Sequence, residues 1–70
     1  MNRFGEKLAT LRQQHGLTIR QLGVELGVNH TFISQLEKNR RKPNAEMILK
    51  ISLFFEMSTD QLMRDDLELE

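Results

Sequence analysis

Residues 29–38 combine hydrogen-bonding and apolar side chains in a pattern that suits contact with the edges of nucleic-acid bases. On a helical wheel, polar side chains gather on one arc of about 140° and apolar side chains lie opposite. The polar arc holds His30, Thr31, Ser34, Gln35 and Lys38, and the apolar side holds Phe32, Ile33 and Leu36. Short uncharged groups can reach the floor of a DNA groove and hydrogen-bond to base edges there, because no salt bridge competes for them.

Residues 38–42, KNRRK, place four cations in five positions directly after this segment. Lysine and arginine in a loop that leaves a groove meet the phosphates that border it. The same residues would also fit an ordinary amphipathic helix followed by a solvated basic loop. The pattern therefore leaves both interpretations open.

The formal net charge of zero hides a strong asymmetry along the chain. Residues 1–42 carry eight Lys/Arg and three Asp/Glu, whereas residues 43–70 carry two Lys/Arg and seven Asp/Glu. This asymmetry indicates that the first part meets a polyanion while the acidic end stays away from it. Two solvated faces of opposite charge would explain the counts equally well.

Length and composition exclude several classes of protein. A chain of 70 residues has room for one small core, and without cysteine it has no disulfide or thiolate ligands, so we expect no metal or other cofactor and a reducing, cytoplasmic location. No apolar run reaches the roughly 18 residues needed to cross a bilayer, so we expect no membrane partner. No nucleophile elbow or glycine-rich phosphate loop is present, and no small-molecule ligand is evident, which argues against an enzyme.

Hydrophobic spacing predicts five helices and no strand. The expected helices cover about residues 2–15, 18–26, 29–38 and 44–55, with a last helix from residue 58 that fades into the acidic end. Thr18–Gln21 and Ser58–Gln61 have the form of capping boxes, and Gly27 suits a left-handed residue after a helix. We expect an all-α domain over residues 1–66 and an acidic tail at 67–70, whose final Leu-Glu has the form of a cloning scar.

The second and third expected helices have the features of a helix-turn-helix. Gly23 and Gly27 are small residues where two helices must approach and turn sharply. The apolar residues that would lock one helix across the other are Leu22, Leu26, Val28, Ile33 and Leu36.

The segment LTIRQLGVELGVNHTFISQLEKNRRKP, residues 17–43, resembles the XRE family of phage Cro- and repressor-like DNA-binding domains. The resemblance extends from FGEKLATLRQQHGLT at the start to MSTDQL near the end. It implies a compact five-helix bundle of the lambda-repressor-like class whose third helix enters the major groove of double-stranded DNA. It also implies a transcriptional regulator, expected to be a repressor that acts as a homodimer on an inverted repeat.

The resemblance assigns roles to individual residues. Base contacts are expected from Asn29, His30, Thr31, Phe32, Ser34 and Gln35, with His30, Thr31 and Gln35 as the central readers. Phosphate contacts are expected from Thr18, Arg20, Lys38, Asn39, Arg40, Arg41 and Lys42. Phe32 stands at the edge of the apolar stripe, so a place in the core is favoured for it.

Four residues depart from the family pattern. Ile19 stands where the family often has a glutamine that touches phosphate, and Gly23 replaces the usual alanine, which weakens the second helix by about 0.5–1 kcal/mol. Asn39 and Glu56 replace glycines that often follow helices in the family. A glutamate with positive φ would carry strain of about 1–2 kcal/mol.

Two further expectations concern side chains away from the reading face. Arg12 borders the apolar stripe of the first helix and Glu37 falls on the inward side of the third, at positions that pair in the family, so we expect an internal ion pair. The fourth helix is apolar on all but a narrow sector, which is more than one core can cover. The expected dimer interface comprises Met47, Phe54, Leu62 and Met63.

A competing interpretation keeps the fold and changes the function. The same helices could form a small protein-interaction module, antitoxin-like or adaptor-like, with weak or no DNA binding. The response of binding to salt separates the two, because phosphate contacts weaken steeply as salt rises and an apolar protein interface does not.

Overall fold

The computed structural model of this protein describes residues 1–69, which form five helices and, within that range, no strand. The helices are α1 (Phe4–Gln14), α2 (Ile19–Leu26), α3 (His30–Glu37), α4 (Ala45–Phe55) and α5 (Thr59–Met63). The predicted all-α class is confirmed. The predicted helices differ from the observed ones by one or two residues at their ends, where capping residues flank the helical backbone.

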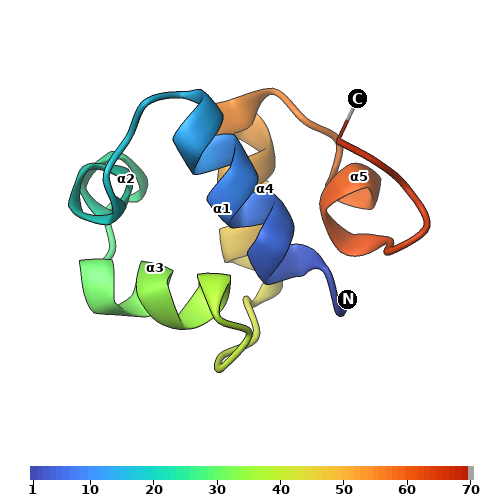
Figure 1. Cartoon of the computed structure of the whole chain (residues 1–70), viewed down its shortest axis with the longest axis horizontal. Helices are drawn as coiled ribbons and strands as arrows, with labels where there is room; N and C mark the ends of the chain where they lie inside the picture. The colour runs from blue at the N-terminus through green and yellow to red at the C-terminus, as the bar shows by residue number, and fades with distance from the viewer. Residues whose placement is uncertain (70) are drawn as a thin grey trace.

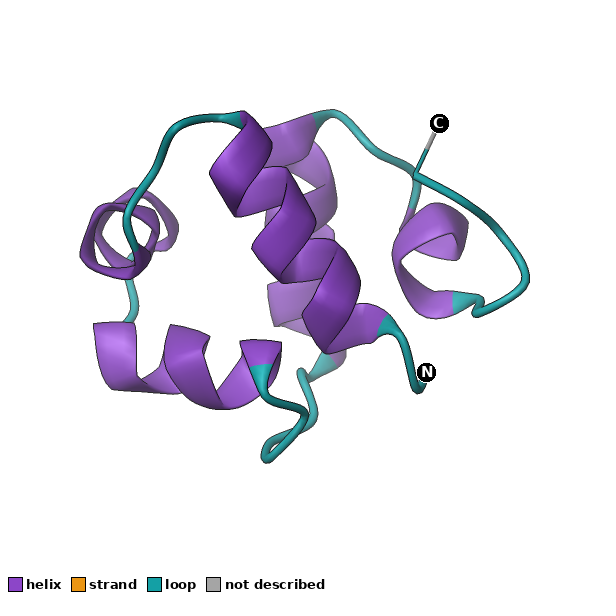
Figure 2. Cartoon of the chain, viewed as in Figure 1, coloured by secondary structure: helices purple, strands orange, loops and turns teal. Residues whose placement is uncertain are grey.

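Figures 1 and 2 show α2 and α3 on one side of a central pair formed by α1 and α4, with α5 on the other side. α3 packs against both α1 and α2, and α5 packs against both α1 and α4. The residues between α2 and α3, 27–29, make a tight turn, and a longer loop joins α3 to α4. α3 is therefore held from two neighbouring helices while its lower side in Figure 1 stays uncovered.

All five helices contribute apolar side chains to one core. Its buried members are Phe4, Leu8, Leu11, Leu22, Leu26, Ile33, Leu36, Met47, Ile48, Ile51, Phe55 and Leu62. Two of them were predicted at a dimer interface. Leu62 is completely buried and Met47 is 7% exposed, so that part of the prediction was wrong. The reason is that α5 folds back onto α1 and α4 and so covers the core within one copy.

Two non-glycine residues adopt the left-handed backbone conformation after a helix. Asn39 has φ 58° after α3, and Glu56 has φ 56° after α4. Asparagine tolerates this region, whereas glutamate carries strain there of about 1–2 kcal/mol. Both positions are those where the family often has glycine, so the chain keeps the turns and bears the strain at Glu56.

Two helical glycines allow the backbones around α3 to come close. A β-carbon built on Gly23 would lie 2.8 Å from the carbonyl oxygen of Val28, and one built on Gly5 would lie 2.5 Å from the carbonyl oxygen of Glu37. Any side chain at either position would force the backbones apart, because real β-carbons do not approach so closely. Gly23 thus lets α2 meet the start of α3, and Gly5 lets α1 meet its end.

The C-terminal segment folds back onto α1. The buried Lys7 ammonium donates to three carbonyl oxygens, of Gln61 at 2.5 Å, Arg64 at 2.7 Å and Leu67 at 2.6 Å. Leu69 packs against the core. The predicted acidic tail at 67–70 is thus part of the packed domain as far as residue 69, and Glu70 lies outside the described residues.

Asp65 holds the residues that precede α1, from the opposite end of the chain. Its carboxylate accepts the backbone N–H groups of Asn2 and Arg3, each at 2.9 Å, and these bonds lower the pKa of Asp65. No side chain near Arg3 in sequence caps that helix end. The side chain that accepts an N–H of the first helical turn, that of Gly5, is Asn39, so Asp65 fixes the residues just before the helix.

The predicted ion pair between Arg12 and Glu37 is present and largely buried. Arg12 Nε donates to one carboxylate oxygen of Glu37 at 2.7 Å, and a terminal guanidinium nitrogen donates to the other at 3.2 Å. The second terminal nitrogen donates to the carbonyl of Leu17 at 2.9 Å. The two charged side chains are only 14% and 9% exposed. Arg12 thus connects α1 to the start of the α2 segment and to the inner side of α3.

Replacement of Glu37 by alanine is expected to lower the free energy of unfolding by several kcal/mol, on the order of 3, because it strands a buried guanidinium. Chemical denaturation measures the change. Glu6→Ala is the matched control, since it removes a carboxylate from the exposed pair with Arg3 and is expected to change stability little. A loss below about 1 kcal/mol for Glu37→Ala would show that the buried pair does not hold α3.

Candidate nucleic-acid interface

The turn between α2 and α3 is built from local hydrogen bonds. Gly27 adopts φ 72° at the end of α2, and the N–H of Val28 donates to the carbonyl of Gly23 at 2.9 Å. The side chain of Asn29 then accepts the N–H of Thr31 at 2.7 Å and starts α3. This side-chain bond gives Asn29 a structural role and leaves its amide N–H groups free to meet a base at the margin.

α3 buries one face and exposes the other. Ile33 and Leu36 are fully buried against α1 and α2. On the opposite side, Thr31 and Lys38 are exposed, and His30, Ser34 and Gln35 are half-exposed. Within residues 1–69 the side chains of His30, Thr31, Ser34 and Gln35 make no hydrogen bond to the rest of the protein. The predicted polar arc therefore lies together on the free side of the helix, with its donors and acceptors available.

The start of α2 lies at the flank of this surface. The Thr18 hydroxyl oxygen accepts the N–H of Gln21 at 3.0 Å, and the Gln21 side chain accepts the N–H of Thr18 at 2.8 Å, which completes the predicted capping box. The Thr18 hydroxyl can still donate its proton outward. Arg20 is exposed in the first turn of the helix. Both residues stand at a helix N-terminus, which favours an anion.

Asn39 has a structural role at the end of α3. Its amide oxygen accepts the N–H of Gly5 at 3.1 Å, and its amide nitrogen donates to the carbonyl of Asn2 at 3.2 Å. This side chain therefore holds the start of α1 against α3, and the phosphate contact expected of Asn39 stays a prediction, since its amide nitrogen keeps one N–H free to donate. The sequence did not reveal this because it gave no sign that residues 2–5 come close to residue 39.

The remaining cations of the predicted interface are all exposed. They are Arg20, Lys38, Arg40, Arg41 and Lys42. None of them pairs with a carboxylate in the part of the chain that the structure describes, whereas each of the other three arginines does. The Arg41 guanidinium lies over the ring of Phe32, 5.0 Å from its centroid. Phe32 itself is half-buried and packs against the core, as its position at the edge of the stripe indicates.

Several acidic residues of the C-terminal part lie on the other side of the molecule. Asp65 and Glu68 bind Arg3 and the start of α1, and Asp60 is exposed in the first turn of α5. Figure 1 places α5 and the C-terminal segment across α1 from α2. Part of the charge asymmetry along the sequence thus becomes a separation in space, and within residues 1–69 the exposed cations near α3 form no ion pair with a carboxylate.

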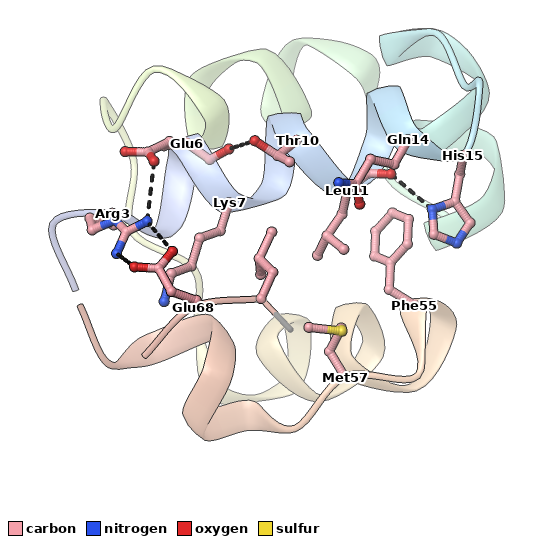
Figure 3. A pocket seen from close by; sticks show the side chains of 11 residues that line it. Arg3, Glu6, Lys7, Thr10, Leu11, Gln14, His15, Phe55, Met57 and Glu68 are labelled. Carbon is pink, nitrogen blue, oxygen red and sulfur yellow. Dashed lines mark hydrogen bonds and ion pairs between the residues drawn. The ribbon is translucent and has the colours of Figure 1, made fainter. Parts of the chain in front are cut away.

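A surface pocket of about 650 Å³ opens on the α1 side, away from the free face of α3. Figure 3 shows its polar side chains turned toward one another, with Arg3 between Glu6 and Glu68. At its other end the ring of His15 meets that of Phe55 edge-on, 4.8 Å between centroids. Its charged groups pair mainly among themselves, and we assign it no ligand. Within residues 1–69 no group of three metal-ligating side chains occurs, and no helix is long and apolar enough to cross a bilayer.

Comparison with known proteins places this geometry in a family. A family model described as a helix-turn-helix domain matches residues 5–67. The transcriptional activator BcrR of Enterococcus faecalis is 42% identical over 60 residues, which are 86% of this chain and 29% of BcrR. Repressor protein C2 of Salmonella phage P22 is 38% identical over 66 residues, 91% of this chain and 30% of that protein. The chain spans half or less of the length of the curated relatives it matches.

A solved structure supports the same assignment. The crystal structure of the P22 c2 repressor in complex with a synthetic operator superposes with a TM-score of 0.83 at 32% identity, and the match covers 90% of this chain and 96% of that one. The relatives are named as a transcriptional activator, a transcriptional regulator and a repressor protein. The chain therefore belongs to the helix-turn-helix family of XRE-type, Cro- and repressor-like DNA-binding domains.

Proposed function

We propose that this protein regulates transcription by binding a specific sequence of double-stranded DNA with α3 in the major groove. The observation that carries the proposal is the free face of α3, whose polar side chains have no partner within residues 1–69 and are followed by unpaired cations. A DNA groove supplies base edges as partners for the polar side chains and phosphates as partners for the cations. The P22 c2 repressor, which has the same fold, was crystallised with operator DNA.

Each part of the surface has a distinct task in this proposal. His30, Thr31 and Gln35 read bases, with Asn29, Phe32 and Ser34 at the margin of the contact. Phosphate contacts come from Thr18, Arg20, Lys38, Asn39, Arg40, Arg41 and Lys42. The first group sets which sequence is bound, and the second sets how tightly any sequence is bound and how strongly salt weakens it.

We further propose that binding represses transcription in the cytoplasm. A domain that occupies the major groove denies other proteins access to that site without any additional contact, whereas activation needs a second surface for a partner. The relatives include both a named activator and a named repressor, each much longer than this chain.

The proposed regulator acts as a homodimer on an inverted repeat. α4 leaves Leu49 and Leu53 52% and 68% exposed, and Met63 of α5 is 40% exposed. Leu53 and the half-buried Phe54 line a shallow surface pocket with Val24 of α2, and we propose that a two-fold partner covers this pocket together with Leu49 and Met63. The sequence predicted Phe54 and Met63 at the dimer interface. We replace the buried Met47 and Leu62 of that prediction by the exposed Leu49 and Leu53. The two α3 helices would then reach half-sites about 34 Å apart.

Gln35→Ala and Arg40→Ala are expected to weaken DNA binding in different ways. Loss of Gln35 should cost about 1–3 kcal/mol on the preferred duplex and much less on random duplex, because only base readout is lost. Loss of Arg40 should weaken both duplexes alike and reduce the salt slope by about one. Anisotropy titrations on both duplexes at several salt concentrations measure these effects.

Two outcomes of these titrations would contradict the proposal. If the two variants show the same affinity losses and the same change in salt slope, base readout by α3 and phosphate binding by the loop are not separate functions. Wild-type binding that barely responds to salt would favour the interaction module, because phosphate contacts give a log–log slope of about −0.9 each.

The dimer predicts a mass of about 16 kDa on sedimentation, twice the 8.2 kDa of one chain, at least when the inverted repeat is present. Leu53→Glu should reduce the species to a monomer because it buries an unpaired charge in the interface. Gln13→Glu adds the same charge at an exposed position of α1 and should leave the dimer intact. An 8 kDa species for the wild type, both free and on DNA, would rule out the dimer.

A further inference from the structure

Among the three cations that follow α3, only Arg41 has a side-chain contact with an aromatic ring in the part of the chain that the structure describes. Its guanidinium carbon lies 5.0 Å from the centroid of the Phe32 ring. Within residues 1–69, the side chains of Arg40 and Lys42 have no hydrogen bond, ion pair or aromatic ring to fix them. Three neighbouring cations of similar charge are therefore not equivalent in structure.

The turn after α3 brings Arg41 back alongside the helix. The N–H groups of Asn39 and Arg40 donate to carbonyls in the last turn of α3 at 3.1 and 2.9 Å. With Asn39 at φ 58°, this pair of bonds reverses the direction of the chain. Phe32 lies near the start of α3 and Arg41 follows its end, so their contact depends on this reversal.

An aromatic face holds a guanidinium in a way that a carboxylate does not. The ring attracts the cation through its quadrupole and leaves the guanidinium N–H donors and its charge free for another partner. By contrast, Arg3 and Arg64 donate to carboxylates and have their charge neutralised locally. Phe32 packs against the core on its inner side, so the ring is a fixed support with Arg41 on its outer side.

Phe32 also lies beside the reading face. It stands three residues before Gln35 on α3, and residues three apart are neighbours on a helix surface. A guanidinium stacked on Phe32 therefore lies at the Gln35 edge of the face that we assign to base readout. A phosphate at that edge of the groove would find a cation already in place.

We propose that Phe32 is a positioning residue for Arg41, and that it holds the guanidinium where it binds the phosphate next to the base read by Gln35. The inference rests on the proposed function. It makes Arg41 an ordered contact, and it leaves Arg40 and Lys42 as mobile ones. Phe32, which we placed at the margin of the base contact, then contributes to DNA affinity through Arg41 in place of a contact of its own with DNA.

A double-mutant cycle tests the proposal on the full chain. Phe32→Leu keeps an apolar side chain against the core and removes the aromatic face, and Phe32→Tyr keeps the face. Affinity for the preferred duplex is measured for each in the wild-type, Arg41→Ala and Arg40→Ala backgrounds. Phe32→Leu should weaken binding about two- to fivefold, the scale of an exposed cation–π contact, and Phe32→Tyr should bind like the wild type. The loss of affinity caused by Phe32→Leu should persist in the Arg40→Ala background and vanish in the Arg41→Ala background.

Several outcomes would overturn the proposal. A loss that persists in the Arg41→Ala background would mean that Phe32 touches DNA itself or acts through the fold. Thermal unfolding of the same variants separates these two cases, since only the second lowers the melting temperature together with affinity. Unchanged affinity for Phe32→Leu would also overturn it. If wild-type DNA binding weakens steeply with salt but the cycle shows no coupling between Phe32 and Arg41, only this inference is rejected. If wild-type binding barely responds to salt, the proposed function is rejected and the inference with it.

Discussion

The contact between Arg12 and Glu37 is the constraint on which the placement of α3 depends. α3 has eight residues, far fewer than a helix needs to be stable alone in water, and one of its faces stays uncovered. Its stability must therefore come from the contacts of its buried face with α1 and α2. Ile33 and Leu36 supply the apolar burial on that face. The buried ion pair also fixes the orientation of α3 relative to α1, because the Arg12 guanidinium binds the Glu37 carboxylate through two nitrogens.

The two ends of α3 are fixed by backbone contacts that depend on glycine. Gly23 lets the turn after α2 lie directly against the start of α3, and Gly5 lets α1 lie against its end. Asn39 then links that end to residues 2–5, and Asp65 holds the same residues from the C-terminal side. The carboxylates of Asp65 and Glu68 are thus engaged with the N-terminus and form no ion pair with the cations beside α3.

The sequence predicted the elements whose signals are local and missed those that depend on distant segments. Capping residues and helical periodicity predicted the helices and the free polar arc, and pairing of wheel positions with the family pattern predicted Arg12 and Glu37. Lys7 carried a signal that was not used, since it occupies a position of the Phe4–Leu8–Leu11 stripe and is buried there. Leu62 could not be assigned from a wheel, because an apolar face looks the same whether its own core or a second copy covers it.

Selection of bound duplexes from a random DNA library tests the central claim, that the free face of α3 reads sequence, most directly. The wild-type protein should enrich one inverted repeat whose half-site centres lie about 10 base pairs apart, with the strongest preferences at the few positions that one α3 helix spans. A retained pool without a shared sequence, bound no better than the starting library, would show that the surface binds phosphates without reading bases and would contradict the claim.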